Sequence, residues 1–124
     1  MKIEMVSYQA VAHLASKASR EGVSISNSKD TVWFVLRDDA GVILSVGGLI
    51  KVKSGYRIKG SWVEPSQRGK GYGGAILEHR LKWAEDKLAS HIETYSYNPE
   101  SYLKRGFVIF GRMSNGAVKL RKTL

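Results

Sequence analysis

The stretch from Val63 to Gly74, Val-Glu-Pro-Ser-Gln-Arg-Gly-Lys-Gly-Tyr-Gly-Gly, constrains the fold of this chain more than any other. The residues before it, 56–63, are rich in β-formers and predict a strand. After it, apolar side chains recur at the spacing of one helix face, at Leu77, Leu81, Ala84 and Leu88. Four glycines and two cations therefore lie where a strand leads into the start of a helix.

A helix start is a natural anion site because its first N–H groups are unpaired and carry the positive end of the macrodipole. Glycines let this backbone approach a ligand without a Cβ between them. Arg68 and Lys70 add positive charge beside it. The stretch therefore predicts a binding site for a phosphate or pyrophosphate.

Two familiar phosphate loops fit this stretch poorly. A Walker A loop needs Gly-Lys-Ser/Thr, but Lys70 is followed by Gly71, and Glu64 stands where the earlier glycine belongs. A dinucleotide-binding pattern is formally present at Gly69, Gly71 and Gly74, with Glu93 about where a ribose-binding acid would lie. That turn, however, should follow its strand directly, and here Glu64 to Arg68 intervene.

A third pattern, Arg-x-x-Gly-x-Gly preceded by Val-x-Pro, fits without adjustment at Val63, Pro65, Arg68, Gly71 and Gly73. It resembles the coenzyme A loop of the GNAT acyltransferase superfamily. A second segment, Tyr102-Leu-Lys-Arg-Gly106-Phe107, looks like the closing Tyr-x-x-x-Gly-Phe element of that family. The two segments occur in the family's order, and the resemblance covers about residues 56–110.

The resemblance implies the fold and the cofactor. We expect one α/β (α+β) domain over residues 1–124, with a central mixed, mostly antiparallel sheet and helices on both faces. Many GNAT proteins carry a second helix before the second strand, but the polar residues 21–30 leave little room for one. We therefore expect that helix to be reduced or missing, which would leave the acceptor side open. The implied cofactor is acetyl-CoA.

The resemblance also implies roles for individual residues. The strand end at Trp62 and Val63 would pair with the pantetheine arm, and the N–H near Val63 would polarise the thioester carbonyl. Tyr102 matches the family tyrosine that protonates the leaving sulfur. Where the family often has an asparagine before this tyrosine, the chain has Tyr95. The expected cofactor-binding residues are Trp62, Val63, Arg68, Gly69, Lys70, Gly71, Tyr72, Gly73 and Gly74.

The acceptor side departs from the family pattern. Arg57 and Lys59 share one face of their strand, because side chains two residues apart point the same way. Many GNAT enzymes place a glutamate base at one of these positions. Two cations there favour an anionic acceptor, or they are only a solvated surface. Glu64 and Glu93 are the carboxylates near the cleft, and neither matches a family position, so the general base stays unassigned.

Bulk properties narrow the possibilities further. A chain of 124 residues suits a single core. Without cysteines it has no disulfide, thiolate metal site or cysteine nucleophile, and its three histidines lack metal-ligand spacing. No apolar run is long enough to span a bilayer and the N-terminus lacks a secretory pattern, so we expect a cytoplasmic monomer or homodimer. The net charge of +9 suggests an anionic partner, and a nucleic acid is compatible with it.

The remaining elements follow from local patterns. We expect strands over about 2–6, 31–37, 42–53, 56–63, 91–95, 107–113 and 117–122, and helices over about 7–20 and 71–89. Ser7 is the expected cap of the first helix, Pro99 starts a short helix that Gly106 ends, and Asn115-Gly116 predicts a hairpin. Trp83 should pack in the core. The expected solvent-exposed face of the long helix carries Arg80, Lys82, Glu85, Asp86 and Lys87.

Three functions remain open. The first is an N-acetyltransferase acting on an amine of unknown identity. The second is modification of adenine in DNA, because phage Mom proteins resemble compact GNAT domains and the basic hairpin is compatible with them. The third is a binding module that kept the cofactor loop and lost catalysis.

Overall fold

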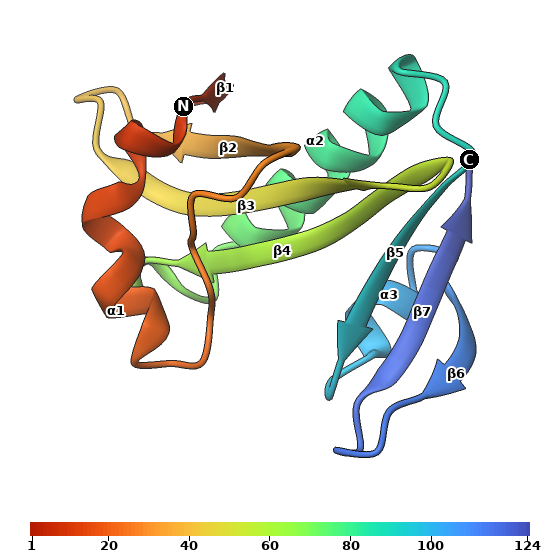
Figure 1. The fold of residues 1–124 in the computed structure, drawn as a ribbon. Coiled ribbons are helices and arrows are strands. Elements are labelled where there is room, and N and C mark those ends of the chain that lie inside the picture. The colour runs from red at the N-terminus through yellow and green to blue at the C-terminus, as the bar shows by residue number, and fades with distance from the viewer.

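A computed structural model describes all 124 residues. Seven strands form one open, twisted sheet in the order β1-β2-β3-β4-β5-β7-β6 (Figure 1). Only β4 and β5 run parallel, and every other neighbouring pair is antiparallel. The strands are β1 (Lys2–Val6), β2 (Thr31–Arg37), β3 (Ile43–Val52), β4 (Gly55–Val63), β5 (His91–Ser96), β6 (Val108–Arg112) and β7 (Val118–Thr123).

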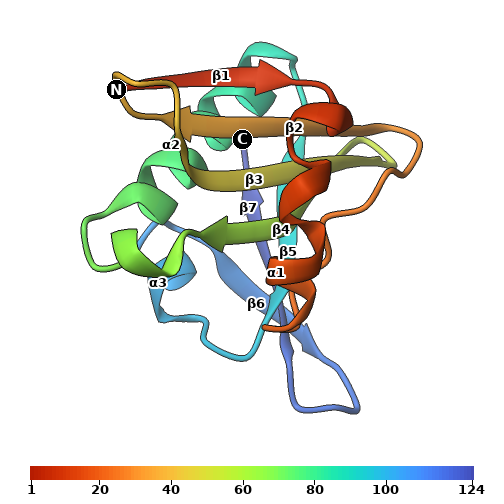
Figure 2. The same ribbon diagram turned by 90° about the vertical axis from the view of Figure 1, so that its left-hand side faces the viewer.

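Helices cover both faces of this sheet. The N-terminal segment with α1 (Ala15–Ser19) lies on one face, and α2 (Tyr72–Asp86) and α3 (Glu100–Leu103) lie on the other (Figures 1 and 2). No helix covers the α1 side of β5, β7 and β6 (Figure 1). The expected α/β (α+β) domain with a mixed, mostly antiparallel sheet is confirmed. None of the helices is both long enough and apolar enough to cross a bilayer.

Two apolar cores hold the helices to the sheet. Beneath α2, side chains of the helix pack on β2–β5 and β7, with Phe34, Leu49 and Ile92 fully buried. Trp83 packs against this core, with its ring 5.6 Å from Phe34 and 5.2 Å from Tyr56 between centroids, as predicted. Beneath α1, Val11, Leu14 and Ala18 pack on Trp33, Val46 and Trp62. Strand β4 contributes to both cores, through Ile58 on one face and Trp62 on the other.

A bulge in β4 makes this change of face possible. The pairing of β3 with β4 shifts between Val46 and Gly48, opposite Gly60, whose φ is +63°. One extra residue in a strand reverses the direction of every later side chain. A Cβ at Gly60 would lie 2.5 Å from the Trp33 ring, so glycine is required there both for its backbone conformation and for space.

Strands β4 and β5 separate shortly before this bulge. They pair only over Gly55–Arg57 and His91–Glu93, and after this point the two strands diverge (Figure 1). The opening between the C-terminal halves of β4 and β5 is called the split below. It lies at the end of β4 that leads into the glycine-rich loop, so the fold brings the predicted anion site and the gap in the sheet together.

Two sequence expectations need correction, and a third is confirmed. Residues 7–20 do not form one capped helix: two 3₁₀ turns, Tyr8–Ala10 and Ala12–Leu14, precede α1, and the Ser7 side chain makes no cap. The predicted apolar face is nevertheless the buried one, because spacings of three and four residues bring it inward in either winding. The second helix is absent, as expected. The prediction that Arg80 lies on the solvent-exposed face of α2 is wrong, since only 1% of this residue is exposed.

Candidate active site

The loop between β4 and α2 presents a row of free amides. A 3₁₀ turn, Pro65–Gln67, precedes Gly69 and Gly71, whose φ angles are +81° and +85°. The first backbone hydrogen bond of α2 runs from Ala75 N–H to the carbonyl of Gly71, so the six N–H groups from Gly69 to Gly74 have no backbone acceptor. The space over Gly69 and Gly71 is open. These amides at the start of a 15-residue helix fit a pyrophosphate.

Arg68 is engaged on the inner side of this loop. Its Nη2 donates to Glu21 Oε1 at 2.6 Å and its Nε to the carbonyl of Val63 at 3.0 Å. Glu21 also accepts from the indole N–H of Trp62 at 3.1 Å. The hydrogen bond from Trp62, followed by the one from Arg68, lowers the pKa of Glu21 below its usual value. Arg68 therefore ties the loop to the end of the N-terminal segment, while Lys70 stays exposed beside Gln67.

The split opens into two cavities that share a wall. The first, of about 340 Å³, is lined by Ser61, Gly73, Gly74, Leu77, Arg80, Ser96, Asn98, Ser101 and Tyr102. The second, of about 310 Å³, is lined by Glu21, Val23, Val46, Ser61, Trp62, Val63, Arg68, Gly73 and Arg80. Ser61, Gly73 and Arg80 border both. The structure thus brings Trp62, Val63, Arg68 and Gly73 together in one cavity, and Gly73, Gly74 and Tyr102 in the other.

Val63 offers a backbone donor at the edge of the split. The N–H of Glu64 donates to the carbonyl of Leu44 on β3 at 3.0 Å. Successive N–H groups of a strand point to opposite edges. The N–H of Val63 is therefore directed away from β3, toward the edge from which β5 has separated.

Tyr102 lies in the short helix α3 and is half-buried. Its ring packs edge-on against Phe107, with 5.3 Å between centroids. Arg105 anchors α3 by donating to Glu78 on α2 at 2.8 Å and to the carbonyl of Ser101 at 3.0 Å. A Cβ at Gly74 would lie 2.7 Å from the Arg105 guanidinium, so this glycine makes room for the anchor. The contact of Arg105, just after α3, with Glu78 of α2 therefore helps to fix Tyr102 relative to the loop.

Arg80 lies at the wall between the two cavities. Its Nη1 donates to the carbonyl of Gly48 at 3.0 Å and its Nη2 to Ser61 Oγ at 3.0 Å. Burial lowers its pKa to about 10, and Tyr102 acts in the opposite direction. The folded protein thus holds this proton less tightly than the unfolded chain, which costs about 3 kcal/mol at neutral pH. That cost is relieved only as the pH rises above about 10.

Arg57 and Lys59 do not line either cavity. Both lie on one face of β4, as their spacing predicted, and this face is the one away from α2. Arg57 Nη1 is 3.9 Å from Glu93 Oε1 and its guanidinium lies 5.6 Å from the Tyr95 ring. Lys59 donates to Ser26 Oγ at 3.0 Å and Ser28 Oγ at 3.1 Å, and its pKa is lowered by burial first and by Arg57 second.

The same side of β5, β7 and β6 is open and basic, and it is called the open basic face below. Arg121 Nη2 is 3.4 Å from Glu93 Oε2, and its guanidinium lies 4.6 Å from the Phe110 ring. Lys119 pairs with Tyr95 across β7 and β5. The face consists of Arg57, Tyr95, Phe110, Lys119 and Arg121 around the nearly buried Glu93.

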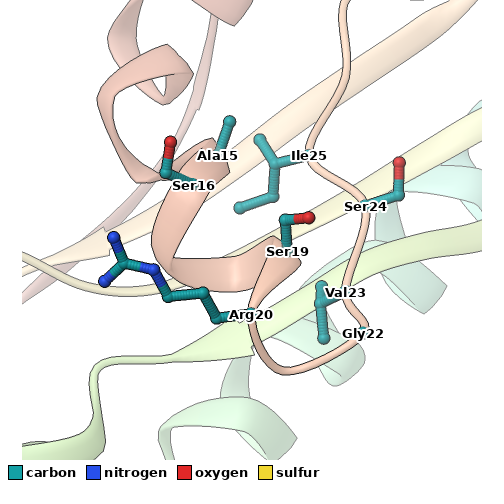
Figure 3. Close-up of a pocket in the computed structure, with 8 residues that line it drawn as sticks. All are labelled: Ala15, Ser16, Ser19, Arg20, Gly22, Val23, Ser24 and Ile25. Atoms are coloured by element: carbon teal, nitrogen blue, oxygen red, sulfur yellow. The ribbon is translucent and has the colours of Figure 1, made fainter.

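A larger hollow of about 700 Å³ lies between α1 and residues 22–25 (Figure 3). Its walls carry small side chains, chiefly serines and Ala15, and Arg20 is its one charged residue. Neither Tyr102 nor Arg80 borders it. The hollow lies where the second helix is absent.

The comparisons with known proteins agree with this geometry. The model of the acetyltransferase (GNAT) domain matches residues 29–109, which include the loop and Tyr102. The chain belongs to the GNAT acetyltransferase family. GNAT enzymes use acetyl-CoA, and the amides of the loop and the adjoining cavities fit this cofactor. No curated protein matches the chain.

Solved structures of low identity share the fold. An IAA acetyltransferase from Bacillus cereus is 21% identical with a TM-score of 0.78, and the alignment covers 99% of both chains. Rv2747 from Mycobacterium tuberculosis, in complex with CoA and NLQ, is 14% identical with a TM-score of 0.82 over 100% of this chain and 99% of that one. A variant of the spermidine N-acetyltransferase SpeG from Vibrio cholerae is 15% identical, with a TM-score of 0.79 over 99% and 95%.

Sequence reasoning missed Arg80, Ser61 and Glu21. Gly47-Gly48 in the middle of an otherwise apolar strand could have indicated Arg80, because glycine inside a strand often marks a close approach. A Cβ at Gly47 would lie 2.7 Å from Cζ of Arg80. Nothing in the sequence indicated that Glu21 would meet Arg68, since 47 positions separate them.

Proposed function

We propose that this protein transfers an acetyl group from acetyl-CoA to an amine, with Tyr102 donating a proton to the leaving sulfur. The observation that carries the proposal is that Tyr102 borders the same cavity as Gly73 and Gly74, at the start of α2. One cavity thus connects the anion-binding amides with a phenolic proton donor. This is the arrangement that an acyl transfer from a thioester requires.

Each group has a separate task in this proposal. The amides from Gly69 to Gly74 hold the pyrophosphate, and the N–H of Val63 polarises the thioester carbonyl. Acetyl-CoA supplies an activated acyl group when it is bound. Tyr102 Oη gives its proton to sulfur, and regains a proton from solvent.

A dedicated base is not needed for an amine that is already neutral. Glu93 is surrounded by Arg57, His91 and Arg121, and Glu64 pairs with Lys17 at 3.3 Å. Both carboxylates are thus held beside cations of the chain, and neither borders the cavity that Tyr102 lines. Deprotonation through ordered water is therefore the route we favour.

The acceptor, in this proposal, carries negative charge near its amine. It approaches from the side away from α2 and α3, where Arg57 and the open basic face surround one carboxylate. A spermidine acetyltransferase has a similar fold, so the fold does not decide the charge of the acceptor. The side chains near the split decide which charge the acceptor can carry, because like charges repel more strongly as water is excluded.

A nucleic acid is the second candidate acceptor, in a Mom-like DNA modification. The open basic face favours it, because Tyr95 and Phe110 lie beside guanidinium groups on an uncovered sheet. Aromatic rings with interleaved cations suit stacked bases and phosphates. Binding of DNA would weaken steeply with salt, whereas acetylation of a small molecule would change little.

The cofactor site is tested by a matched pair of variants, Gly71→Asn and Gly71→Asp. Both side chains tolerate the positive φ of Gly71, and they differ in one charge. Calorimetry should show that the Asp variant binds CoA at least about tenfold more weakly than the Asn variant, since a carboxylate would repel the pyrophosphate. Equal affinities would refute the loop assignment.

The reaction is tested with acetyl-CoA and a set of acceptors of different charge. We expect free thiol to appear with anionic amines such as glutamate and to be absent with spermidine. Single-stranded DNA in the same assay tests the second candidate. If CoA binds but no acceptor yields free thiol, the protein is a CoA-binding module without catalysis, and the proposed function is wrong.

A further inference from the structure

Arg80 is the least compensated charge in the protein. It is 1% exposed, and no carboxylate forms an ion pair with it. Its Nη1 and Nη2 each donate one hydrogen bond, but its buried Nε has no acceptor. Buried charges in proteins are normally paired, because removing them from water is costly. An anion that is not part of the chain would complete this site.

The surroundings of Arg80 are arranged to admit its guanidinium and leave its charge free. On β3, Gly47 has no side chain and so leaves room for Cζ. On β4, Ser61 accepts a hydrogen bond but carries no charge. The titratable groups that border the same two cavities are Tyr102 from α3, and Glu21 with Arg68 on the other side. Glu21 and Arg68 neutralise each other through their 2.6 Å contact.

The guanidinium of Arg80 keeps the capacity to stabilise an anion. It carries five N–H groups. Nη1 and Nη2 donate one hydrogen bond each to protein oxygens, and Nε is the one nitrogen without any partner. Because Arg80 and Tyr102 border the same cavity, an anion bound there lies where a proton donor is also at hand.

We propose that the positive charge of Arg80 stabilises the negative charge that develops on sulfur during acyl transfer, an inference that rests on the proposed function. In that reaction the C–N bond forms and the C–S bond breaks, and the electron pair of the broken bond leaves on sulfur. One proton then passes from nitrogen, by way of solvent and Tyr102, to sulfur. Arg80 keeps its own proton throughout and acts only through its charge.

The test compares the binding of CoA with that of desulfo-CoA, which lacks the thiol. A thiol titrates near pH 8.5, so raising the pH from about 7 to about 9 converts bound CoA to its thiolate. In the wild-type protein the preference for CoA over desulfo-CoA should grow about tenfold or more over this interval. In Arg80→Met it should stay nearly constant, and Arg80→Lys, which keeps a cation, should fall between. Lys82→Met, two residues along α2 and exposed, is the matched control and should behave as wild type.

Turnover gives a second readout. Arg80→Met should lower kcat about tenfold or more while the KM for acetyl-CoA changes little, because the charge acts after binding. The wild-type measurement alone can overturn the proposal: if its preference for CoA does not rise with pH, Arg80 does not bind a thiolate. The same holds if Arg80→Met keeps the pH-dependent preference. In both cases the CoA site and the proposed function stand, whereas failure of both nucleotides to bind refutes the proposed function together with this inference.

Discussion

Arg80 Nη2 donates to Ser61 Oγ at 3.0 Å, and this bond joins the middle of α2 to β4 where β4 leaves β5. A second bond, from Nη1 to the carbonyl of Gly48, reaches β3. One side chain therefore fixes α2 over the strands that form the edge of the split. The same side chain carries a buried charge that lowers stability, so its contribution to folding is the balance of two opposing effects.

Arg80→Met should leave the stability of the protein nearly unchanged or raise it. The substitution removes two hydrogen bonds, worth about 1 kcal/mol each. It also relieves the burial of the charge, about 3 kcal/mol by the pKa of about 10. We expect a free energy of unfolding within about 1 kcal/mol of the parent, or higher, in urea titrations. A loss of several kcal/mol would mean that Arg80 is retained for stability.

Gly47→Ala should destabilise the domain. The added Cβ would lie 2.5 Å from Cγ2 of Ile76 and 2.7 Å from Cζ of Arg80, so α2 has to shift or these side chains have to leave their rotamers. Overpacking of this kind costs about 1–3 kcal/mol. Gly111→Ala is the control, because its Cβ would meet only the flexible Lys119 side chain, at 3.3 Å. Equal stability of the two variants in urea would contradict the packing described for Arg80.

The loop could be predicted from sequence, whereas its partners could not. The glycines between Gly69 and Gly74 indicate a loop whose backbone must adopt conformations that favour glycine. This is a local property, so the spacing of the glycines in the sequence is enough to predict it. The contact between Arg68 and Glu21 depends on how two distant segments pack, and no local pattern encodes it. The loop cations were therefore assigned to the phosphate, although one of them holds the loop itself.

Arg80 shows how residue type can mislead when periodicity does not. The buried residues of α2 are Ile76, Leu77, Arg80, Leu81 and Ala84, so position 80 lies within the apolar stripe. Its charge indicated the solvent-exposed face of the helix, whereas its spacing indicated the buried face. Spacing was the better guide, because the apolar residues set the orientation of the helix, and a polar residue that lies among them is buried with them. Such an exception to the pattern is expected at a functional site.

Tyr102→Phe should reduce turnover while the fold is preserved. Only the hydroxyl is lost, and the edge-on contact with Phe107 remains. Loss of a general acid typically costs about 10²-fold or more in kcat. Calorimetry should show CoA affinity close to that of the parent, and thermal unfolding should be unchanged. If turnover persists while the melting temperature falls, the tyrosine serves only in packing.

Glu21→Gln should destabilise the protein at neutral pH and much less in acid. The folded-state pKa of Glu21 is lowered, so its carboxylate stabilises the fold above the unfolded pKa of 4.5 and loses this effect as the pH falls through the folded value. The difference in melting temperature between parent and variant should therefore be constant near neutrality and shrink below about pH 4.5. A difference that does not depend on pH would show that the ionised form has no special role.

The last prediction concerns the charge of the acceptor. Arg57→Gln combined with Lys119→Gln removes two cations from the open basic face and leaves the contact between Arg121 and Glu93 in place. The control is Lys82→Gln with Lys87→Gln, two exposed cations on α2 and at its C-terminal cap. Both double variants lower the net charge by two from +9, so the overall field of the protein changes equally.

If the acceptor is anionic, only the first pair should raise its KM, by about tenfold, because nearby charges act most strongly where water is partly excluded. CoA affinity should stay unchanged in both, since none of the four substituted cations lies in the loop between β4 and α2. A rise in KM that disappears in high salt would indicate a polyanion, whose binding releases counterions from each neutralised phosphate. Equal behaviour of the two double variants, or efficient acetylation of spermidine by the parent, would show that the open basic face is only a solvated surface.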